Sequence, residues 1–507
     1  MTSRSRMEQT ITTTTTTSNS NTGSDNNNKR KKHDDNNNNT PVTIDTSKMN
    51  LVHASDPNAI MAYKHQNVLD HLEKYYGKDH MNAIRKAQVR PPTFTTIRVN
   101  TSKCDRPHLL NQLRPYFESI QFKLQDNNII PFSNLVKEDT NETIQSITNQ
   151  TILLKNHGPF NPQPKYKQVV VGVLCAEAVL RGSDIFAPGI IGSFKHIVEG
   201  DMVSVFVDLS QDGKRGFIID GYYAERTVFV GNGVSLMNRL DYYSTRGGVG
   251  IKMTERIWDC PPLNGVLTDK LFLQHLPSIL TVFQMDLLPS QREKRSFNIL
   301  DMCAAPGGKT TLIASLVKNN GLGDKITAID KNKKKAKMVS DLCRVNGFDE
   351  NGLVTVRAGD SKKLLIEGVF KEESFDRILL DGPCSGLGTR PRFDEATLLI
   401  DLDNSACLQR VLIDAAVKLL APGGILVYST CTINPCENEE NVKYLLDNYG
   451  SFMQLVPQTG HIGDPGLPGI LPENLSPLVQ RFDPSTNHET IGFFISKFKK
   501  TASSQSK

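Results

Sequence analysis

The chain has 507 residues, 38% hydrophobic and 22% charged, which is the composition of a globular protein too long for a single compact core. Its formal net charge of +5 favours a polyanionic partner only slightly, so binding to nucleic acid has to be argued from individual sites. The absence of a leading apolar segment, of a membrane-spanning run and of regular cysteine spacing argues against a membrane protein and against a disulfide scaffold. We therefore expect an intracellular, cytoplasmic protein with free thiols and two or three domains.

Residues 1–48 are rich in threonine and asparagine and contain almost no large apolar side chains. Such a segment cannot bury enough apolar surface to offset its ordering entropy, which predicts a disordered tail. Within it, Lys29-Arg-Lys-Lys32 is typical of a solvated charge run, although a nuclear address or an auxiliary phosphate contact uses the same residue types. A second short tail is expected over residues 501–507.

Residues 49–167 are predicted to form a small α/β module. The apolar spacing indicates a helix over residues 65–76 and a strand over residues 94–100, and a second helix is expected near residues 109–118. Residues 138–149 are polar and are predicted to form a connection. No residue of this module suggests chemistry, so we assign it a structural role.

The next block, residues 168–245, is predicted to be a compact and mainly β insertion. Short apolar runs at residues 169–174, 202–208 and 226–231 are separated by Gly, Asp and Asn, and one helix is expected over residues 175–181. Some of its basic side chains are candidates for contacts with RNA phosphates, although ordinary surface residues look the same. These candidates are Arg181, Lys195, Lys214 and Arg215.

From residue 246 to residue 500 strands and helices alternate, after a stretch of about 246–290 that includes the end of the N-terminal module. Strands are expected at residues 297–302, 325–330, 353–360, 375–381 and 424–429, and helices at residues 309–318, 333–346 and 406–420. This pattern is typical of a doubly wound parallel sheet, in which ligands bind beyond the carboxyl ends of the strands. The polar residues predicted at those ends are Cys303, Asp330, Asp360, Asp381 and Cys431.

A glycine-rich turn follows the first of these strands and opens a helix. It consists of Cys303, Ala304, Ala305, Pro306, Gly307, Gly308 and Lys309. It is not a Walker A phosphate loop, because Cys303 stands where that motif needs glycine. Adjacent glycines would instead let the backbone lie against a nucleoside cofactor.

The aspartates at the ends of the next strands fit such a cofactor. Asp330 is spaced like the acid that binds a ribose, and Asp360 is placed to face an adenine. The absence of the Gly-x-Gly-x-x-Gly spacing favours S-adenosylmethionine over a dinucleotide. One aspartate alone is more typical of a helix cap, but three of them on successive strands, with Asp381, favour the cofactor.

Two cysteines, Cys384 and Cys431, come at the ends of two successive predicted strands. Such a pair indicates covalent catalysis, in which one thiolate attacks and the other helps to complete the reaction. Either cysteine alone is more typical of an inert buried side chain. The spacing of Cys431 and Cys436 does not fit a paired set of zinc ligands, and we expect no metal.

Three long motifs contain these residues: Leu300-Asp-Met-Cys-Ala-Ala-Pro-Gly-Gly-Lys-Thr310, Asp381-Gly-Pro-Cys-Ser-Gly-Leu-Gly388, and Tyr428-Ser-Thr-Cys-Thr432 followed by Asn434-Pro-Cys-Glu-Asn-Glu-Glu440. With them, and with the last strand Gly492-Phe-Phe-Ile-Ser-Lys-Phe498, residues 246–498 resemble the Sun family (Nol/Nop/Sun) of RNA cytosine-5 methyltransferases. Residues 168–245 resemble a PUA domain, a small RNA-binding pseudo-barrel, through Ala178-Val-Leu-Arg-Gly182, Ala187-Pro-Gly-Ile190 and Gly231-Asn-Gly-Val234. The combination is most similar to the member six type, which methylates transfer RNA in the acceptor stem beside the 3′ CCA end.

The resemblance implies a Rossmann-like methyltransferase domain that uses S-adenosyl-L-methionine, with a small N-terminal α/β module and an inserted PUA-like domain. It implies that Cys431 attacks carbon 6 of cytosine and that Cys384 helps to release the product. Asp381 is implied to hold the flipped base and Lys309 to lower a thiol pKa or to hold the base. In the DNA cytosine enzymes the cysteine of the Pro-Cys pair is itself the nucleophile, so Cys384 could in principle exchange roles with Cys431.

Basic residues near the predicted catalytic loops are further candidates for RNA contacts. Arg390 and Arg392 follow Cys384 in a loop that is expected to meet phosphates. The lysines after Asp330 are equally typical of a solvated helix face. Ile491 stands where the family often has an acidic residue. This difference affects the expected contacts of the last hairpin and not the expected chemistry.

We therefore expect a monomeric enzyme that methylates carbon 5 of cytosine in RNA, with transfer RNA as its partner. A ribosomal RNA enzyme of the same family is the alternative, which the inserted block disfavours. From a different class, a non-catalytic RNA-binding or assembly factor could keep the same fold. The presence of Cys384, Cys431, Asp381 and Lys309 argues against that interpretation.

Overall fold

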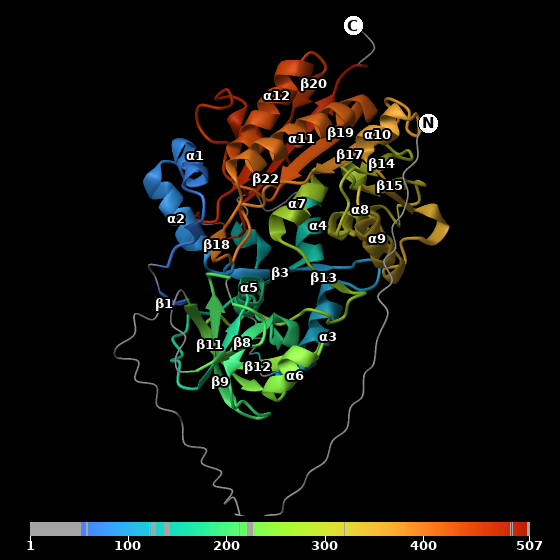
Figure 1. The fold of residues 1–507 in the computed structure, drawn as a ribbon. Helices are drawn as coiled ribbons and strands as arrows, with labels where there is room; N and C mark the ends of the chain where they lie inside the picture. The colour runs from blue at the N-terminus through green and yellow to red at the C-terminus, as the bar shows by residue number, and fades with distance from the viewer. Residues whose placement is uncertain are drawn as a thin grey trace, which may run out of the picture. The chain divides into compact units, whose positions relative to one another are not determined.

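The computed structural model describes residues 52–56, 59–120, 122, 128–135, 142–211, 213–220, 227–318, 320–486, 488 and 490–503. The predicted tail of residues 1–48, with its basic run at residues 29–32, lies outside the described residues, as do residues 504–507. All described residues belong to one compact unit, Val42–Lys507. They form three sheets of four or more strands and one short two-stranded sheet (Figure 1).

The sheet that carries the predicted strand-end residues has the order β16-β15-β14-β17-β19-β22-β20, and β21 pairs with β22. Its strands are β14 (Asn298–Asp301), β15 (Lys325–Asp330), β16 (Val354–Ala358), β17 (Phe375–Asp381), β19 (Leu420–Thr430), β20 (Met453–Leu455), β21 (Gln480–Phe482) and β22 (Phe493–Lys500). The first five of these strands are paired in parallel, whereas β22 is antiparallel to its neighbours. The carboxyl ends of the five parallel strands therefore lie along one edge.

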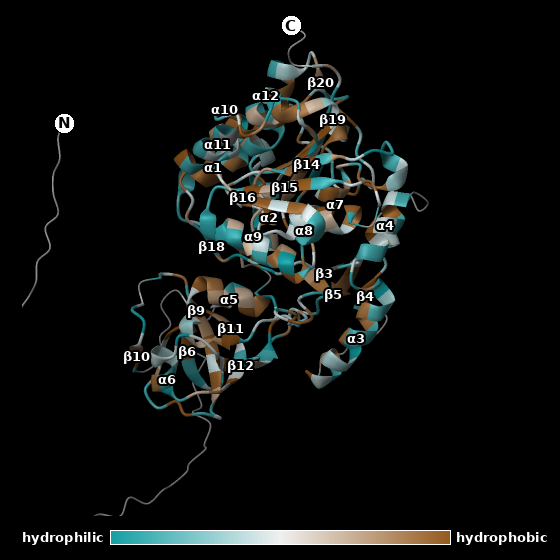
Figure 2. Ribbon diagram, turned by 90° about the vertical axis from the view of Figure 1, so that its right-hand side faces the viewer, coloured by the Kyte–Doolittle hydropathy of each residue, from teal (hydrophilic) through white to brown (hydrophobic). Residues whose placement is uncertain are grey.

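Helices cover both faces of this sheet. On one face pack α7 (Leu276–Phe283), α8 (Gly308–Val317) and α9 (Lys333–Val345), and on the other α10 (Ser361–Ile366), α11 (Leu399–Leu419) and α12 (Glu439–Tyr449). Neighbouring strand residues point to opposite faces, so Ile299 joins the core with α7 and α8 while Leu300 joins the core with α11. Figure 2 shows brown, hydrophobic stretches in the elements of this sheet, as two-sided burial requires.

The β-rich block forms a second sheet with the order β10-β8-β6-β9-β11-β12-β7, in which β1 also pairs with β11. Its elements are β1 (Val52–His53), β6 (Lys167–Val171), α5 (Val173–Leu180), β7 (Ile185–Phe186), β8 (Ile190–Phe194), β9 (Met202–Asp208), β10 (Phe217–Ile219), β11 (Thr227–Ser235), α6 (Arg239–Ser244) and β12 (Val249–Arg256). Strands β1 and β12 lie outside the predicted limits of 168 and 245. The reason is that β11 pairs with β9, β12 and β1, which sequence spacing does not reveal.

The third sheet belongs to the N-terminal module and has the order β13-β3-β5-β4. Its elements are β3 (Phe94–Val99), α3 (Arg106–Ser119), β4 (Ile129–Ile130), α4 (Glu142–Gln150), β5 (Thr151–Lys155) and β13 (Leu271–Leu273). Helix α4 occupies most of the segment predicted to be a polar connection, so that prediction is wrong. Ile144 and Ile147 lie three residues apart and are buried in the core beside α7, which stabilises the helix in spite of its polar composition.

A fourth, two-stranded sheet pairs β2 (Ala62–Tyr63) with β18 (Asp394–Glu395). Along the chain, β2 is followed by α1 (Gln66–Tyr76) and α2 (Lys78–Gln88). Leu69 and Leu72 of α1 pack in one cluster with Leu387, Leu402 and Ile433, so these helices support the loops that follow β17 and β19. Within the described ranges, no helix is long and apolar enough to cross a membrane.

Candidate active site

Cys384 and Cys431 meet at the carboxyl edge of the central sheet. Asp381, the last residue of β17, is in register with Ser429 of β19, so the two following loops begin side by side. Both cysteine side chains are half-buried, and their Sγ atoms lie 3.3 Å apart. This distance is a hydrogen-bond contact between sulfurs and is much longer than the roughly 2.05 Å of a disulfide. The predicted pairing of two strand-end cysteines is present as two free thiols.

Two glycines fix the backbone of the Cys431 loop. The backbone N–H of Gly388 donates to the carbonyl of Cys431 at 3.0 Å, and the N–H of Gly492 donates to the carbonyl of Gly388 at 2.7 Å. A Cβ atom on Gly388 would collide with the carbonyl of Gly492 and would also lie 2.8 Å from the carbonyl of Cys431. Only glycine therefore fits at this position.

Glu437 anchors the loop that carries Cys384. It is fully buried, and its side chain accepts hydrogen bonds from the backbone of Ser385 at 2.9 Å and from the side chains of Gln409 at 2.9 Å and Asn434 at 3.0 Å. A further hydrogen bond of 2.7 Å joins the hydroxyls of Ser385 and Thr432, the residues that follow the two cysteines. The sequence motif around residue 437 was noted above, but only the structure gives this residue a role.

Lys309 and Asp381 form a charged pair beside the thiols. The ammonium of Lys309 lies 2.5 Å from Oδ2 of Asp381, and the hydroxyl of Ser429 donates to Oδ1 of Asp381 at 2.6 Å. The two thiols differ in their surroundings. The hydrogen bond from Cys384 and the charge of Lys309 lower the pKa of Cys431, whereas that same contact, burial and nearby Glu437 raise the pKa of Cys384. Of the two cysteines, Cys431 is therefore the one poised to be a thiolate.

The glycine-rich turn is shaped by packing. Gly307 has φ +103°, a left-handed conformation that favours glycine, and it precedes the first residue of α8. A Cβ atom on Gly308 would lie 2.9 Å from the ring of Phe272. Gly308 thus lets α8 approach β13, while a Cβ atom on Gly307 would lie 3.0 Å from the side chain of Leu342 on α9. The expectation that the two glycines make room for a cofactor stays a prediction.

A cavity of about 440 Å³ lies next to this turn, past the ends of β14, β15 and β16. Its lining includes Cys303, Asp330, Asp360, Pro383 and Leu412. Asp330 accepts a hydrogen bond from the backbone N–H of Asn332 at 2.8 Å. Asp360 caps α10 by accepting a hydrogen bond from the backbone N–H of Lys362 at 3.2 Å. Both aspartates therefore stabilise local backbone and also face the cavity. Burial, with the nearby aspartates, raises the pKa of Cys303, which marks it as an inert thiol.

The N-terminal module contributes a residue that sequence analysis missed. Arg98 of β3 is buried and donates to the backbone carbonyl of Gly308 at 2.9 Å and to the hydroxyl of Thr311 at 2.8 Å. Its guanidinium also lies over the ring of Phe272, with its central carbon 5.0 Å from the ring centroid. An arginine between Ile97 and Val99 of this strand was the available signal.

The predicted RNA contacts fall into different environments. Arg390 is only 6% exposed and donates to the backbone carbonyls of Arg90, Pro91 and Pro484 at 2.9 to 3.0 Å. The prediction that Arg390 meets phosphates is therefore wrong in this structure. A guanidinium can satisfy several carbonyls that irregular loops leave unpaired, and here it ties the Cys384 loop to the N-terminal module.

The other basic candidates reach the surface. Arg392 is half-buried and pairs with Glu395 at 2.6 Å. Exposed positions are occupied by Arg181, Lys195, Lys214 and Arg215, although Arg215 also donates to the carbonyl of Tyr242 at 2.8 Å.

In the part of the chain that the structure describes, no group of three or more His, Cys, Asp or Glu residues could hold a metal ion.

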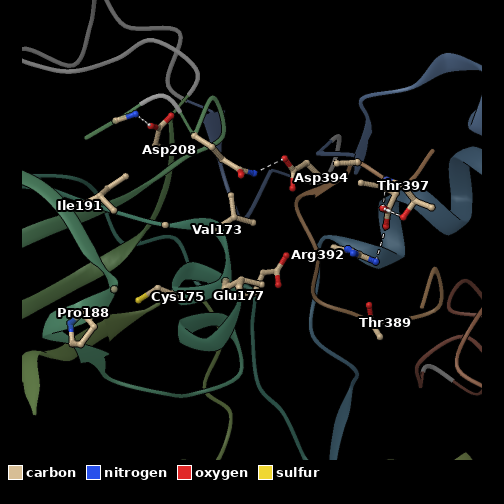
Figure 3. Close-up of a pocket in the computed structure, with 17 residues that line it drawn as sticks. Val173, Cys175, Glu177, Pro188, Ile191, Asp208, Thr389, Arg392, Asp394 and Thr397 are labelled. Atoms are coloured by element: carbon tan, nitrogen blue, oxygen red, sulfur yellow. Dashed lines mark hydrogen bonds and ion pairs between the residues drawn. The ribbon is translucent and has the colours of Figure 1, made fainter. Parts of the chain in front are cut away.

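Arg392 also lines a cavity of about 820 Å³ between α5 and the loop of residues 389–397. Figure 3 shows Glu177 and Arg392 on its two sides, the first from α5 of the β-rich block and the second from the loop of residues 389–397. Asp208 and Asp394 lie at one end of the same view. The cavity thus mixes acidic and basic side chains from two regions of the chain.

The site can now be compared with known proteins. Residues 285–499 match the family model described as 16S rRNA methyltransferase RsmB/F. The tRNA (cytosine(72)-C(5))-methyltransferase NSUN6 of Mus musculus is 37% identical, with 82% of this chain and 89% of that protein covered. The rRNA (cytosine-C(5))-methyltransferase NOP2C of Arabidopsis thaliana is 32% identical, with 85% and 89% covered.

A solved structure has the same fold. The crystal structure of NSun6 from Pyrococcus horikoshii with SFG superposes with a TM-score of 0.67 at 29% identity, covering 87% of this chain and 99% of that chain. The α/β fold predicted from the alternating strands and helices is thus a methyltransferase fold, and the resemblance stated from the sequence motifs is confirmed. The chain belongs to the Sun family of RNA cytosine-C5 methyltransferases.

Proposed function

We propose that this protein methylates carbon 5 of a cytosine in transfer RNA, with S-adenosyl-L-methionine as the methyl donor. The observation that carries the proposal is the pair of thiols, 3.3 Å apart, beside the Lys309–Asp381 ion pair at the carboxyl edge of the sheet. Carbon 5 of cytosine is a poor nucleophile until a thiolate adds to carbon 6. A site with one activated thiol and a second thiol in contact with it suits that chemistry.

The residues at the cavity beside the glycine-rich turn fit the proposed cofactor. Asp330 and Asp360 offer carboxylate oxygens to ribose hydroxyls and to an amino group, and Cys303 and Leu412 offer less polar walls. When bound, S-adenosylmethionine supplies an electrophilic methyl group. The crystal structure of NSun6 from Pyrococcus horikoshii with SFG, an analogue of S-adenosylmethionine, supports the same assignment.

Cys431 is the proposed nucleophile. Its thiolate forms a bond to carbon 6 of the flipped cytosine, and electron density moves to carbon 5 and to ring nitrogen 3. Asp381, ionised beside Lys309, is placed to accept a hydrogen bond from the amino edge of the base, and the ammonium of Lys309 is placed to donate to nitrogen 3 as negative charge develops there. Lys309 also favours the thiolate form of Cys431.

Cys384 is the proposed group that completes the reaction. Before attack it donates a hydrogen bond to the Cys431 thiolate, which holds its pKa high. Once the Cys431 sulfur is bonded to carbon 6, that neighbouring negative charge is gone and Cys384 can more easily lose its proton. Once its own proton has passed to solvent water, the Cys384 thiolate removes the proton from carbon 5, directly or through water. The electron pair of that bond re-forms the double bond between carbons 5 and 6, and Cys431 leaves as a thiolate.

The β-rich sheet is proposed to be a PUA-like RNA-binding domain. The exposed side chains of Arg181, Lys195 and Lys214 supply positive charge for phosphates, and the cavity of Figure 3 lies between this block and the loop of residues 389–397. The identity with NSUN6 favours transfer RNA. Ribosomal RNA is the second candidate, because NOP2C, a ribosomal RNA methyltransferase, is 32% identical to this chain.

A direct assay tests this function. The full chain is incubated with radiolabelled S-adenosylmethionine and either transfer RNA or ribosomal RNA transcripts, and bisulfite sequencing then maps the modified cytosine. We expect methylation of transfer RNA, its loss in Cys431→Ala, and no change in Cys407→Ser, which alters an exposed cysteine on α11. Methylation of ribosomal RNA alone would contradict the substrate assignment.

A further inference from the structure

The loop that carries Cys384 is held on both sides of the thiol by one buried network. The backbone N–H of Ser385 donates to Oε2 of Glu437 at 2.9 Å. The side chain of Gln409 donates from Nε2 both to the carbonyl of Pro383 at 2.8 Å and to Oε2 of Glu437 at 2.9 Å. One carboxylate oxygen therefore fixes the residues before and after Cys384, directly on one side and through Gln409 on the other.

The network around Gln409 and Glu437 extends to further buried partners. Both side chains are fully buried. Oε1 of Gln409 accepts hydrogen bonds from the hydroxyl of Tyr428 at 2.9 Å and from Nδ2 of Asn441 at 2.8 Å. The same Tyr428 hydroxyl also contacts the backbone carbonyl of Glu437. Buried polar networks with paired members hold one arrangement of the groups that they connect, so the Cys384 loop is kept in a single position.

Glu437 brings a negative charge that its partners do not neutralise. Its side chain accepts from the backbone N–H of Ser385 and from the amides of Gln409 and Asn434, and all three donors are uncharged. Three donors leave no acceptor for a carboxyl proton, so this environment suits the carboxylate form. Because little water screens a charge in a protein interior, such a carboxylate acts on groups several ångströms away.

The charge of Glu437 acts on the thiol of Cys384. The hydrogen bond to Cys431 and burial raise the pKa of Cys384, and the charge of Glu437 raises it further. The other charged or titratable groups around the two thiols are Lys309, Asp381 and Tyr428. Once the Cys431 sulfur is bonded to carbon 6, its effect on Cys384 is lost while burial and Glu437 remain. A thiol that holds its proton more strongly gives a stronger base when it is ionised.

We propose that Glu437 is a positioning residue for the release step, which fixes the Cys384 loop and strengthens the Cys384 thiolate as the base that takes the proton from carbon 5. This inference rests on the proposed function. In that step the electron pair of the bond from carbon 5 to hydrogen re-forms the double bond between carbons 5 and 6, and Cys431 leaves as a thiolate. Removing the charge of Glu437 should therefore weaken the base while Cys431 still attacks.

The first measurement examines the Cys384 thiol without RNA. Cys431→Ala removes the neighbouring thiol, and mass spectrometry follows the alkylation of the Cys384 peptide by iodoacetamide across a pH series. With Glu437 intact, the midpoint should lie above the usual thiol pKa of about 8.5. Adding Glu437→Gln, which keeps the size of the side chain and removes its charge, should lower the midpoint by about one pH unit.

Two further variants in the same Cys431→Ala protein separate charge from support. Gln409→Met breaks the hydrogen bond to Pro383 and keeps the charge of Glu437, so the alkylation midpoint of Cys384 should stay in place. Glu372→Gln removes an exposed charge and should also leave the midpoint unchanged. A shift in Glu437→Gln alone would therefore come from its charge.

The second measurement uses the protein with both cysteines and follows the decay of the covalent protein–RNA adduct at several pH values. Glu437→Gln should slow the decay by roughly threefold, because the base is weaker, and the rate should stop rising at a lower pH, because the base loses its own proton sooner. Gln409→Met should slow the decay without moving that pH. A slower decay in Glu437→Gln with no change in its pH dependence would show a purely structural role and overturn the inference.

The alkylation results also distinguish this inference from the proposed function. An unchanged Cys384 midpoint in Glu437→Gln would overturn the inference. A midpoint at or below about 8.5 with Glu437 intact would do so as well, and this result does not depend on the folding of Glu437→Gln. A protein that showed the expected midpoints but formed no adduct with any RNA would instead contradict the proposed function, and with it the release step, while the action of Glu437 on the thiol stood.

Discussion

Arg98 of β3 donates a hydrogen bond of 2.9 Å to the backbone carbonyl of Gly308, the first residue of α8. A residue of the N-terminal module thereby holds the turn beside the proposed cofactor cavity. Burial lowers the pKa of Arg98 to about 9, and the guanidinium is paired with two oxygens and an aromatic ring. The module therefore contributes a buried contact to the turn of the candidate site.

Arg98→Met should lower the free energy of unfolding by about 1–3 kcal/mol, because it removes a buried donor from the oxygens of Gly308 and Thr311 and leaves the Gly308 carbonyl with a longer side-chain hydrogen bond, 3.2 Å from the Thr311 hydroxyl. It should also weaken the binding of S-adenosylmethionine, which chemical denaturation and calorimetric titration would measure separately. The control is Arg344→Met on α9, which breaks only an exposed pair with Asp341 and should cost well under 1 kcal/mol. Wild-type stability and wild-type cofactor affinity in Arg98→Met would contradict this role.

Gly388→Ala should reduce methyl transfer by about a hundredfold with a smaller change in RNA affinity. The added Cβ would push against the carbonyls of Gly492 and Cys431, and a displacement of about 1 Å in a catalytic group can cost that much. Single-turnover rates and RNA binding measure the two effects. Gly247→Ala is the matched control, because a Cβ there meets nothing within 4 Å. If both variants lost activity equally, the packing argument would fail.

The reactivity of Cys431 should depend on Lys309. Because the hydrogen bond from Cys384 and the charge of Lys309 lower the Cys431 pKa, its alkylation by iodoacetamide should reach half its maximal rate below the usual thiol pKa of about 8.5. Lys309→Met should move that midpoint to higher pH, since the thiolate loses a stabilising charge. Mass spectrometry of the Cys431 peptide across a pH series gives the midpoint. An identical midpoint in both proteins would refute the electrostatic assignment.

The buried carboxyl group of Asp301 should make the free energy of unfolding of the protein depend on pH. Burial raises the pKa of Asp301 in the folded protein to about 6, above the ordinary value of 3.8, so the folded state favours the protonated form. The carboxyl group therefore costs no stability at acid pH, and its cost develops as the pH rises from about 4 to 6. Asp301→Asn should remove this cost, with an upper limit of about 3 kcal/mol at pH 7.5. Asn can still accept the hydrogen bond that Thr310 donates to Oδ2.

Urea denaturation of both proteins at pH 4 and at pH 7.5 measures that difference. The stabilisation by Asp301→Asn should be large at pH 7.5 and small at pH 4. An equal effect at the two pH values would show that the carboxylate is not the destabilising group.

The sequence predicted those parts of the site that depend on strand ends. The strands expected at residues 325–330 and 375–381 coincide with β15 and β17, because apolar runs that end in an aspartate mark both limits. Parallel pairing then brings Asp381 beside Ser429 and makes the cysteines neighbours. Local pattern and general topology were sufficient for this step.

Contacts between distant segments were not predictable from local pattern. Helix α11 begins at Leu399 and not near residue 406. Asp401 accepts a hydrogen bond from the backbone of Leu398 at the start of the helix, and the polar residues that resemble a loop, Asp403, Asn404 and Ser405, lie inside it. Arg390 looked like a phosphate contact, yet the carbonyls that bury it come from residues about 300 positions earlier and about 95 positions later. The same holds for Arg98, whose role depends on how the N-terminal module packs against α8.

The central claim is that Cys431 attacks and Cys384 releases. Incubating RNA and S-adenosylmethionine with the two cysteine variants, followed by denaturing electrophoresis, tests it directly. The account predicts that Cys384→Ala accumulates a covalent protein–RNA adduct and that Cys431→Ala forms none. An adduct in Cys431→Ala but not in Cys384→Ala, or normal methylation by both variants, would contradict it.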